Sequence, residues 1–412
     1  MASNRLRLLI YSSGVEINKR GCMKQLVISP IFPHSSHTFV THEIGETLLR
    51  GHDVVILAPG AGDDEGKPLA EKFSIKTDNV IYSDVIDCPV LSLDPLRITR
   101  RVRQAAQRPF YGFTLSERRK SFFVRLLRNP LIEDVQIIHA HFAGWAYEVA
   151  LPLSKLLGVP YTLVAHEGHL SKHRNEHLQK LQETASGIAL PSTAWRDLWI
   201  SKTKSAKRLH VIPNAVNTSE FLNRERLIEH RTTVSVVMVA RLVPGKRVSD
   251  GLIVLRQLLN RNINCQLIIL GSGPEKNNLL GQARSLGLSE HTQFLGVQPH
   301  SRVVDELIKA DIYFHPSERE SFGISMAEAM AAGVPIVAAR SGGAQDIVVN
   351  GVTGTLCPIG DIHCMTNAIA DLACDIKLRV EQGEAGQKRA LELFNWEARM
   401  DSLMSIWQKA LC

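Results

Sequence analysis

Two glutamates eight positions apart are the residues of this chain best suited to chemistry. Glu320 and Glu328 lie in the segment HPSERESFGISMAEAMAAGVPIVA, residues 315–338. A carboxylate can accept two hydrogen bonds side by side, which suits it to the paired hydroxyl groups of a sugar or a ribose. A simpler alternative is that Glu328 is only an acidic residue in a favourable position near the N-terminus of a helix.

The sequence around these glutamates predicts a strand, a turn and a helix. The strand includes 311–315 and ends at Pro316, because proline cannot donate to a sheet. A turn follows at Ser321–Gly323, then a helix over 324–332 that Gly333 ends, then a strand over 334–339. Such a unit directs free backbone N–H groups beyond the end of the strand, where anions bind.

Cations for an anionic ligand are available in the segment VARLVPGKR, residues 239–247. Arg241 and Lys246 follow a predicted buried strand in a Pro-Gly loop, whereas we expect Arg247 to be an ordinary surface residue. An arginine and a lysine would stabilise a diphosphate leaving group as its charge develops. Gly271 begins a second glycine turn after a strand, which a plain loop turn explains equally well.

Length and composition indicate a multidomain globular protein. With 412 residues, two or three domains are expected. Neither a long apolar run nor a secretion signal is evident. The seven cysteines form no CxxC pair, which favours reduced thiols in a cytoplasm over a disulfide framework or a structural zinc site.

The order of predicted elements favours two α/β domains. Short β-rich runs alternate with helical ones, lapse near residues 213–231, and then begin again. We therefore predict two Rossmann-like domains at 23–222 and 223–394, an N-terminal extension of uncertain role at 1–22, and an amphipathic C-terminal helix at 395–412. That helix is expected to cross back to the first domain.

One segment makes the protein basic. Residues 97–128 hold ten Lys or Arg and one Glu, so their charge of +9 exceeds the net charge of +7. No nucleic-acid motif accompanies them. An anionic membrane surface is one candidate partner; the alternative is a solvated helix pair whose aromatic residues pack inward. The expected membrane patch consists of Arg100, Arg101, Arg103, Arg118, Arg119, Lys120, Phe122 and Phe123.

Taken together, the motifs resemble glycosyltransferases of the GT-B fold, specifically family 4, the retaining enzymes that use nucleotide sugars. The matching segments include FPHSSHTFVTHEI, IIHAHFA, YTLVAHE, ARLVPGK, LGSGP, HPSERESFGISMAEAMAAGVPIVA and SGGAQDIVVNGVTG. The resemblance extends from about Met23 to the C-terminus and implies two Rossmann-like domains that face each other across a cleft. It also implies a cytoplasmic enzyme, peripheral to the membrane, similar to those that build bacterial surface polysaccharides.

The resemblance implies roles for individual residues. Glu320 would bind the hydroxyls of the donor sugar, Glu328 the ribose, and His166 would orient the reacting sugar. The remaining donor contacts would come from Arg241, Lys246, Gly271, Phe322, Gly323 and Ile324, with Arg241 and Lys246 on the diphosphate. The catalytic set is then His166, Arg241, Lys246 and Glu320, and the alternative for His166 is a satisfied core histidine.

This chain departs from the family pattern on both the donor and the acceptor side. Asp346 replaces a Glu after a double glycine, a change that bears on donor fit, and His37 stands where many relatives have Glu, in the loop expected to face the acceptor. His169, His173 and His177 are spaced four apart, so a helix would place them on one face, to line the cleft or to hold a metal. We expect the acceptor face to comprise Ser36, His37, His169, His173 and Arg174, without a metal.

The expected activity is transfer from a UDP- or GDP-sugar to a lipid-linked saccharide, with no cofactor and no nucleic acid. Three alternatives share these sequence features: transfer to a soluble small molecule, a sugar-nucleotide epimerase, and a non-catalytic lectin-like scaffold. A phosphorylase lacks support, because no cofactor-lysine motif is evident.

Overall fold

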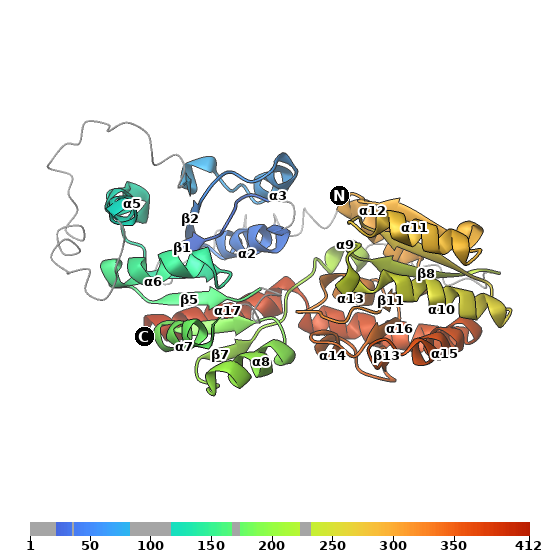
Figure 1. Cartoon of the computed structure of the whole chain (residues 1–412). Coiled ribbons are helices and arrows are strands. Elements are labelled where there is room, and N and C mark those ends of the chain that lie inside the picture. The colour runs from blue at the N-terminus through green and yellow to red at the C-terminus, as the bar shows by residue number, and fades with distance from the viewer. Residues whose placement is uncertain (1–21, 35–36, 83–116, 167–173, 223–231) are drawn as a thin grey trace, which may run out of the picture. The chain divides into compact units, whose positions relative to one another are not determined.

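The computed structural model describes residues 22–34, 37–82, 117–166, 174–222 and 232–412 (Figure 1). The predicted extension at 1–22 lies outside these residues except for Cys22, so its role is not addressed. The chain forms two compact units, which meet in sequence between Thr162 and Leu163; Ala410–Cys412 belong with the first. The strands of the described residues form two sheets.

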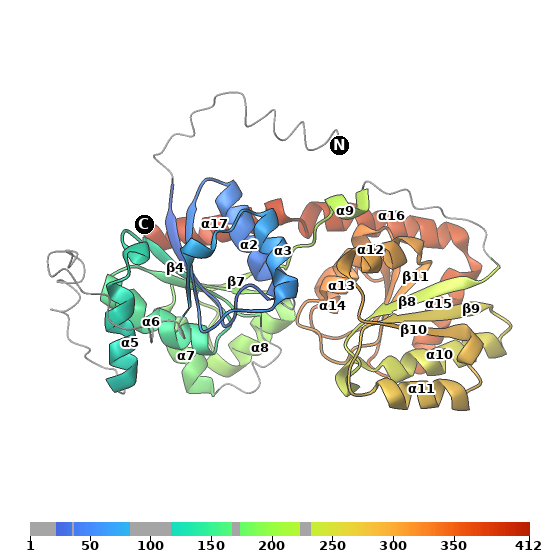
Figure 2. The same ribbon diagram turned by 90° about the horizontal axis from the view of Figure 1, so that it is seen from above.

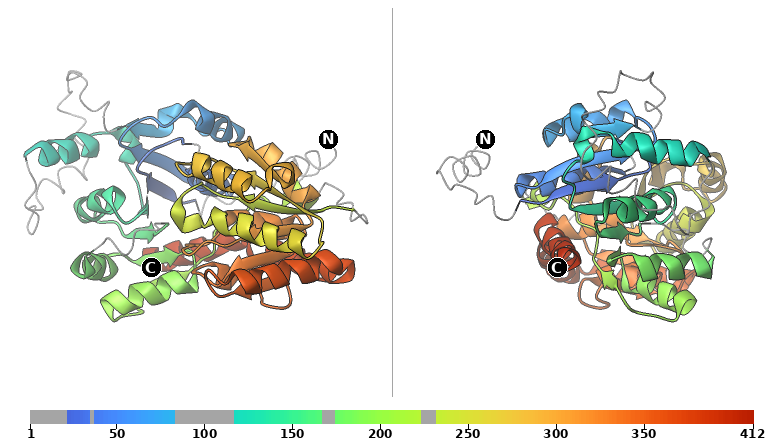
Figure 3. Two further views of the ribbon diagram at one scale, coloured as in Figure 1. Left: turned by 45° about the vertical axis from the view of Figure 1, so that its right-hand side comes forward. Right: turned by 90° about the vertical axis from the view of Figure 1, so that its left-hand side faces the viewer.

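The first sheet has seven strands in the order β3-β2-β1-β4-β5-β6-β7. Strand β1 pairs in parallel with β2 on one side and with β4 on the other. In Figure 3 the strands run in colour from blue to green. Their bounds are β1 Lys24–Ile28, β2 Asp53–Ala58, β3 Val80–Tyr82, β4 Ile137–His141, β5 Tyr161–Val164, β6 Gly187–Leu190 and β7 Leu209–Val211.

The second sheet has six strands in the order β10-β9-β8-β11-β12-β13. All of its strand pairs are parallel. Hydrophobic residues dominate these strands, as both faces of the sheet are covered. The bounds are β8 Val234–Val239, β9 Cys265–Leu270, β10 Thr292–Gly296, β11 Ile312–His315, β12 Ile336–Ala339 and β13 Gly354–Cys357.

Helices connect these strands in chain order. Those of the first sheet are α2 Thr38–Leu49, α3 Lys67–Lys72, α5 Glu117–Leu127, α6 Trp145–Leu157, α7 Asn175–Thr184 and α8 Thr193–Thr203, whereas α9 Ser219–Leu222 places Phe221 in a core of the second sheet. Those of the second are α10 Val248–Asn260, α11 Lys276–Ser285, α12 His300–Lys309, α13 Ile324–Ala331, α14 Ala344–Ile347, α15 Ile362–Cys374 and α16 Ile376–Leu393. The last helix is α17 Trp396–Leu411.

Separate hydrophobic cores cover the two faces of the second sheet. On one face Val237 and Tyr313 pack with residues of α12, α13 and α16. On the other, Met238 and Phe314 pack with residues of α10, α11 and α15. Figure 2 shows strands β8 and β9 between these two groups of helices. The alternation of successive side chains across a strand therefore builds a three-layer α/β/α sandwich.

Helix α17 packs against the strands of the first sheet (Figure 1). A Cβ atom on Gly187 of β6 would lie 2.5 Å from Ile406, so the helix approaches the strand closely. Arg399 is buried and donates to the backbone carbonyl of Pro213 at 2.9 Å. This arrangement confirms the predicted return of the C-terminal helix to the first Rossmann-like fold.

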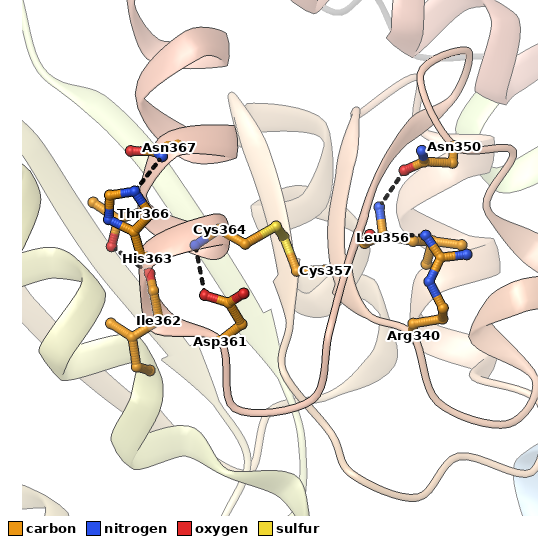
Figure 4. Close-up of a disulfide and its surroundings, with 10 residues drawn as sticks. All are labelled: Arg340, Asn350, Leu356, Cys357, Asp361, Ile362, His363, Cys364, Thr366 and Asn367. Carbon is orange, nitrogen blue, oxygen red and sulfur yellow. Dashed lines mark hydrogen bonds between the residues drawn. A yellow bond between two sulfur atoms is a disulfide. The ribbon is translucent and has the colours of Figure 1, made fainter.

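A disulfide joins Cys357, the last residue of β13, to Cys364 in the first turn of α15 (Figure 4). Asp361 lies in the loop between them and accepts a hydrogen bond from the Cys364 N–H at 2.9 Å. The sequence analysis expected seven reduced thiols, so it was wrong for this pair. Cys22, Cys265, Cys374 and Cys412 are free.

Candidate active site

The two loops that carry the predicted donor residues follow adjacent strands, β8 and β11. The chain leaves these strands toward opposite edges of the sheet, and in parallel α/β sheets such a switch point binds ligands at the carboxyl ends of the strands. Lys246 ends a 3₁₀ turn, Pro244–Lys246, after β8. Its Nζ lies 2.5 Å from Oε2 of Glu320, which follows β11. The structure thus brings the predicted cation and carboxylate together.

Glu320 also has a partner that the sequence analysis did not identify. Nε2 of His315, the last residue of β11, lies 2.9 Å from the same Oε2 atom. Burial alone would raise the pKa of Glu320, but the hydrogen bonds and charges of His315 and Lys246 outweigh it and lower the pKa to about 2. Glu320 is therefore ionised at neutral pH, with Oε2 engaged and Oε1 left to accept hydrogen bonds from a ligand.

Two glycines after β12, Gly342 and Gly343, contact the backbone of the loop that carries Glu320. The N–H of Gly343 donates to the Glu320 carbonyl at 2.8 Å. Gly342 has φ +44°, and a Cβ atom there would lie 1.9 Å from that carbonyl oxygen, so only glycine fits. The double glycine of the SGG segment therefore serves to position Glu320.

Gly323 begins helix α13 with a left-handed backbone, φ 106°. The amides of the first turn of a helix have no partner within the helix, so those at Ile324 and its neighbours can bind an anion. Phe322 is buried and packs edge-on against Phe394, with 5.5 Å between ring centroids. Phe322 therefore anchors the turn, and only its backbone is suited to contact a ligand.

Glu328 lies one turn into α13, in a different electrostatic setting. Oε1 of Glu328 lies 3.8 Å from Nδ1 of His300, and Nε2 of His300 pairs with Glu220 at 3.0 Å. Burial raises the pKa of Glu328 to about 7; His300 lowers that pKa and Glu220 raises it. Neither His300 nor Glu220 was among the predicted residues, because they come from α12 and α9, far away in sequence.

Two further predicted donor residues lie at the ends of their strands. Arg241 is exposed, two residues after β8. Gly271 follows β9 with φ +124°, and a Cβ atom there would lie 1.9 Å from the carbonyl oxygen of Ala240. The glycine thus allows the loops after β8 and β9 to run side by side, which gives the glycine turn a specific structural purpose.

Asp346, at a position where the family resemblance implies Glu, has its partner at the start of α8. Its carboxylate accepts from the backbone N–H of Thr193 at 2.6 Å and from the hydroxyl of Thr193 at 2.5 Å. Thr193 is the first residue of α8, so Asp346 satisfies an amide at the start of that helix. The presence of Asp instead of Glu at position 346 therefore affects the contact with Thr193.

On the first sheet, the predicted acceptor residues also lie beyond carboxyl strand ends. His37 precedes α2, and its ring centroid lies 4.9 Å from that of Phe142, which follows β4. Burial lowers the pKa of His37, and so does the charge of His34. His166 follows β5 and is half-buried. Ser36, His169 and His173 lie outside the described residues.

Of the three evenly spaced histidines only His177 lies among the described residues, and helix α7 does not extend back from it to the other two. Helix α7 begins at Asn175, and Arg174 before it has an extended backbone, with ψ 145°. An extended residue between the second and third histidine breaks the four-residue spacing that a shared helical face requires. His177 lies in α7, whereas Arg174 only precedes it.

Part of the predicted membrane patch is also corrected. Phe123 in α5 is 2% exposed and Leu126 is 1% exposed, so this face of the helix packs inward. Phe122 is half-buried. The predicted arginines at 100, 101 and 103 lie outside the described residues, as do the side chains at 118–120. No helix among the described residues is long and apolar enough to span a membrane.

Comparison with known proteins bears out the family resemblance. The family model named Glycosyltransferase Family 4 matches residues 38–220, and the one named Glycosyl transferases group 1 matches residues 220–389. The chain is 30% identical over 277 residues to the GDP-mannose-dependent alpha-(1-6)-phosphatidylinositol monomannoside mannosyltransferase of Mycolicibacterium smegmatis, covering 62% of this chain and 72% of the relative. The chain belongs to glycosyltransferase family 4.

Further relatives and solved structures agree with this family 4 assignment. The amylovoran biosynthesis glycosyltransferase AmsK of Erwinia amylovora is 24% identical, over 88% of this chain and 92% of AmsK. Anabaena HepE, solved with UDP and glucose, has a TM-score of 0.68 at 20% identity, covering 93% and 98% of the two chains. The galactosyltransferase WaaB has a TM-score of 0.66 at 17% identity, covering 93% and 99%. The GT-B fold predicted from sequence is thereby confirmed.

Proposed function

We propose that this family 4 enzyme transfers a sugar from a UDP- or GDP-sugar to a hydroxyl of a lipid-linked saccharide, with retention of configuration and without a metal in the reaction. The observation that carries the proposal is the Lys246–Glu320–His315 cluster beside the start of α13. It combines a cation for phosphate, an ionised carboxylate for sugar hydroxyls and helix amides for an oxyanion, all on adjacent loops.

In the proposed reaction the donor lies at the carboxyl ends of β8 and β11. Lys246 has three N–H donors, so it can keep Glu320 in place and still bind the diphosphate. Arg241 adds a second charge as the bond from the anomeric carbon to the phosphate oxygen breaks. Oε1 of Glu320 accepts from the sugar hydroxyls, and Glu328 accepts from the ribose.

The acceptor hydroxyl attacks the anomeric carbon from the same face as the one from which the leaving group departs. Its proton passes to the departing phosphate oxygen, so the products are a glycoside and a nucleoside diphosphate. Because His315 and Lys246 hold Glu320, we assign it to hydroxyl binding and not to covalent attack. His166 at the end of β5 would orient the sugar, and residues 23–222 and 223–394 would serve as acceptor and donor domains.

The acceptor class rests on the relatives. The mycobacterial mannosyltransferase is named for a phosphatidylinositol monomannoside acceptor, a glycolipid, and AmsK for amylovoran biosynthesis. A lipid-linked acceptor in polysaccharide or glycolipid biosynthesis agrees with both names. A cytoplasmic enzyme at the membrane surface is the corresponding location and stays a prediction.

The test is nucleotide release from a panel of UDP- and GDP-sugars, with and without a bacterial lipid extract. We expect release from one donor that increases with lipid, and loss of at least about 100-fold in kcat/KM for Glu320→Gln and for Lys246→Ala. Lys377→Ala, which removes an exposed ion pair with Glu381, is the matched control. Full turnover by both site variants would refute the proposal, and an altered free sugar nucleotide without acceptor would indicate an epimerase.

A further inference from the structure

A buried group of three side chains in the first unit lies apart from the donor residues. His139 and His141 are the third and fifth residues of β4, so they project from the same face of the sheet. Glu43 faces them from α2. All three side chains are at most 3% exposed.

Their ligand atoms converge on one point. Oε1 of Glu43 lies 2.9 Å from Nε2 of His139 and 3.4 Å from Nε2 of His141. One nitrogen of each histidine and one oxygen of the glutamate all lie within 4.8 Å of one another. Around tetrahedral zinc, with bonds of about 2.0–2.1 Å, neighbouring ligand atoms are about 3.3–3.4 Å apart. The two distances from Glu43 to the histidines differ from that spacing by at most about 0.5 Å, and the two histidine nitrogens lie within 4.8 Å of each other.

A hydrogen bond fixes the orientation of one histidine. Nδ1 of His139 lies 2.7 Å from the hydroxyl of Thr162 on β5, so the ring presents Nε2 to Glu43. Histidines that bind metals are oriented in this way by a partner on the second ring nitrogen, which also sets the tautomer. Without an ion, Nε2 of His139 donates to the Glu43 carboxylate at 2.9 Å; metal binding would displace that proton, with Nδ1–H then donating to Thr162.

We propose that Glu43, His139 and His141 form a divalent metal site of the first unit, with zinc as the ion that best suits two imidazoles and one carboxylate. Three protein ligands leave the fourth position of a tetrahedral zinc ion for a water molecule or a hydroxide. Such an ion would join α2 to β4, which in its absence are joined here by the hydrogen bond between His139 and Glu43. The sequence analysis expected no metal, because helix and strand bring the ligands together from residues 96 and 98 positions apart.

The proposal is tested by metal binding to the full chain, purified through a tag that contains no histidine. The protein is stripped with a chelator, titrated with Co²⁺, and examined by visible absorption for a four-coordinate complex that Zn²⁺ then displaces. We expect one ion per chain by elemental analysis, with nitrogen and oxygen ligands by X-ray absorption. At a free Zn²⁺ concentration about 100 times Kd, the folding equilibrium shifts about 100-fold toward the folded state.

Matched variants distinguish this site from other histidines of the chain. His141→Gln and Glu43→Gln should each abolish the cobalt bands. The control is His52→Gln, because His52 is a buried histidine of the same unit that accepts from the Met23 N–H instead. Absence of a one-to-one complex in the wild-type protein, or equal binding by His141→Gln and wild type, would overturn the proposal in favour of a proton-sharing triad. The wild-type spectra decide the question even if a variant does not fold.

Discussion

Neighbouring charges and burial set the carboxylates of Glu320 and Glu328 to different pKa values. Glu320, between His315 and Lys246, has its pKa lowered to about 2. Glu328 is 14% exposed, and burial raises its pKa to about 7. At neutral pH one carboxylate is therefore fully ionised, while the other is close to half protonated. If Glu328 binds the ribose hydroxyls as proposed, the ionised form is the stronger acceptor, so donor affinity should depend on pH through this residue.

Donor affinity should therefore rise with pH. If only ionised Glu328 binds the ribose, a pKa of about 7 makes Kd about tenfold weaker at pH 6 than at pH 8. The stability of the unliganded protein changes in the opposite direction. The folded-state pKa of Glu328 exceeds the ordinary value of 4.5. The free energy of unfolding therefore falls as the pH rises from 4.5 to about 7. Calorimetric titration with the active nucleotide sugar measures the first effect.

Two variants check the assignment to Glu328. Glu328→Gln should bind weakly at every pH and lose the tenfold slope. His300→Asn should move the midpoint upward, because His300 lowers the pKa of Glu328. A slope that survives in Glu328→Gln would assign the titration to a different group.

His315 is a positioning residue whose removal should be visible in the pH profile. In His315→Gln, Glu320 keeps Lys246 but loses its second partner, so the pKa of Glu320 should rise and the acid limb of kcat/KM should move to higher pH. A displaced carboxylate can cost about 10²-fold in rate. Steady-state kinetics from pH 4 to 8 test this expectation, and a lower rate with an unmoved acid limb would contradict it.

At the scale of elements, the loop after β12 determines where the loop after β11 lies. Gly342→Ala would place a Cβ atom 1.9 Å from the Glu320 carbonyl oxygen. We expect a loss of at least about 1 kcal/mol in stability from backbone strain and about tenfold or more in donor affinity. Gly281→Ala is the matched control, since a Cβ there meets nothing within 4 Å in α11. It should stabilise the protein by about 0.5–1 kcal/mol and leave affinity unchanged, as measured by denaturation and donor titration.

The disulfide between β13 and α15 should contribute to stability. Closing so short a loop typically contributes about 2 kcal/mol, so a reducing agent should lower the Tm by several degrees. Cys364→Ser should have a lower Tm that does not respond to the reductant. Cys374→Ser removes an exposed free thiol and should still respond like wild type. Identical melting curves of the wild type with and without reductant would show that the bond does not form in solution.

Elements with a strong hydrophobic pattern were predictable from sequence, and contacts between distant elements were not. The predicted strands that became β8, β9 and β11 are buried runs, and α13 ends before Gly333 as expected. Strands β3 and β13 were not predicted, because each is a short run among polar and turn-forming residues. Glu320 and Lys246 were found through motifs and family resemblance. His315, His300 and the Glu43 group depend on tertiary proximity, which spacing along the chain does not encode.

For the whole molecule, charge is concentrated in one segment. Residues 97–128 carry +9, so the remainder of the chain is slightly acidic. Burial of Phe123 and Leu126 directs the apolar face of α5 inward. Phe123 and Leu126 are therefore not free to insert into a membrane, and any membrane affinity of α5 would come mainly from the electrostatic attraction of its Lys and Arg, which salt screens.

The resulting prediction is salt-dependent binding to anionic vesicles. The protein should sediment with phosphatidylglycerol vesicles at low salt and dissociate as the ionic strength rises toward 0.5 M, because the Debye length falls below about 5 Å. Replacing Arg118, Arg119 and Lys120 by Gln should weaken binding by about two orders of magnitude, at about 1 kcal/mol per charge. The control variant replaces Lys276, Arg284 and Lys309, three exposed cations of the second sheet's helices, and changes net charge equally. If both triple variants lost affinity to the same extent, net charge and not the basic segment would govern the association, since only a local patch distinguishes two proteins of identical charge.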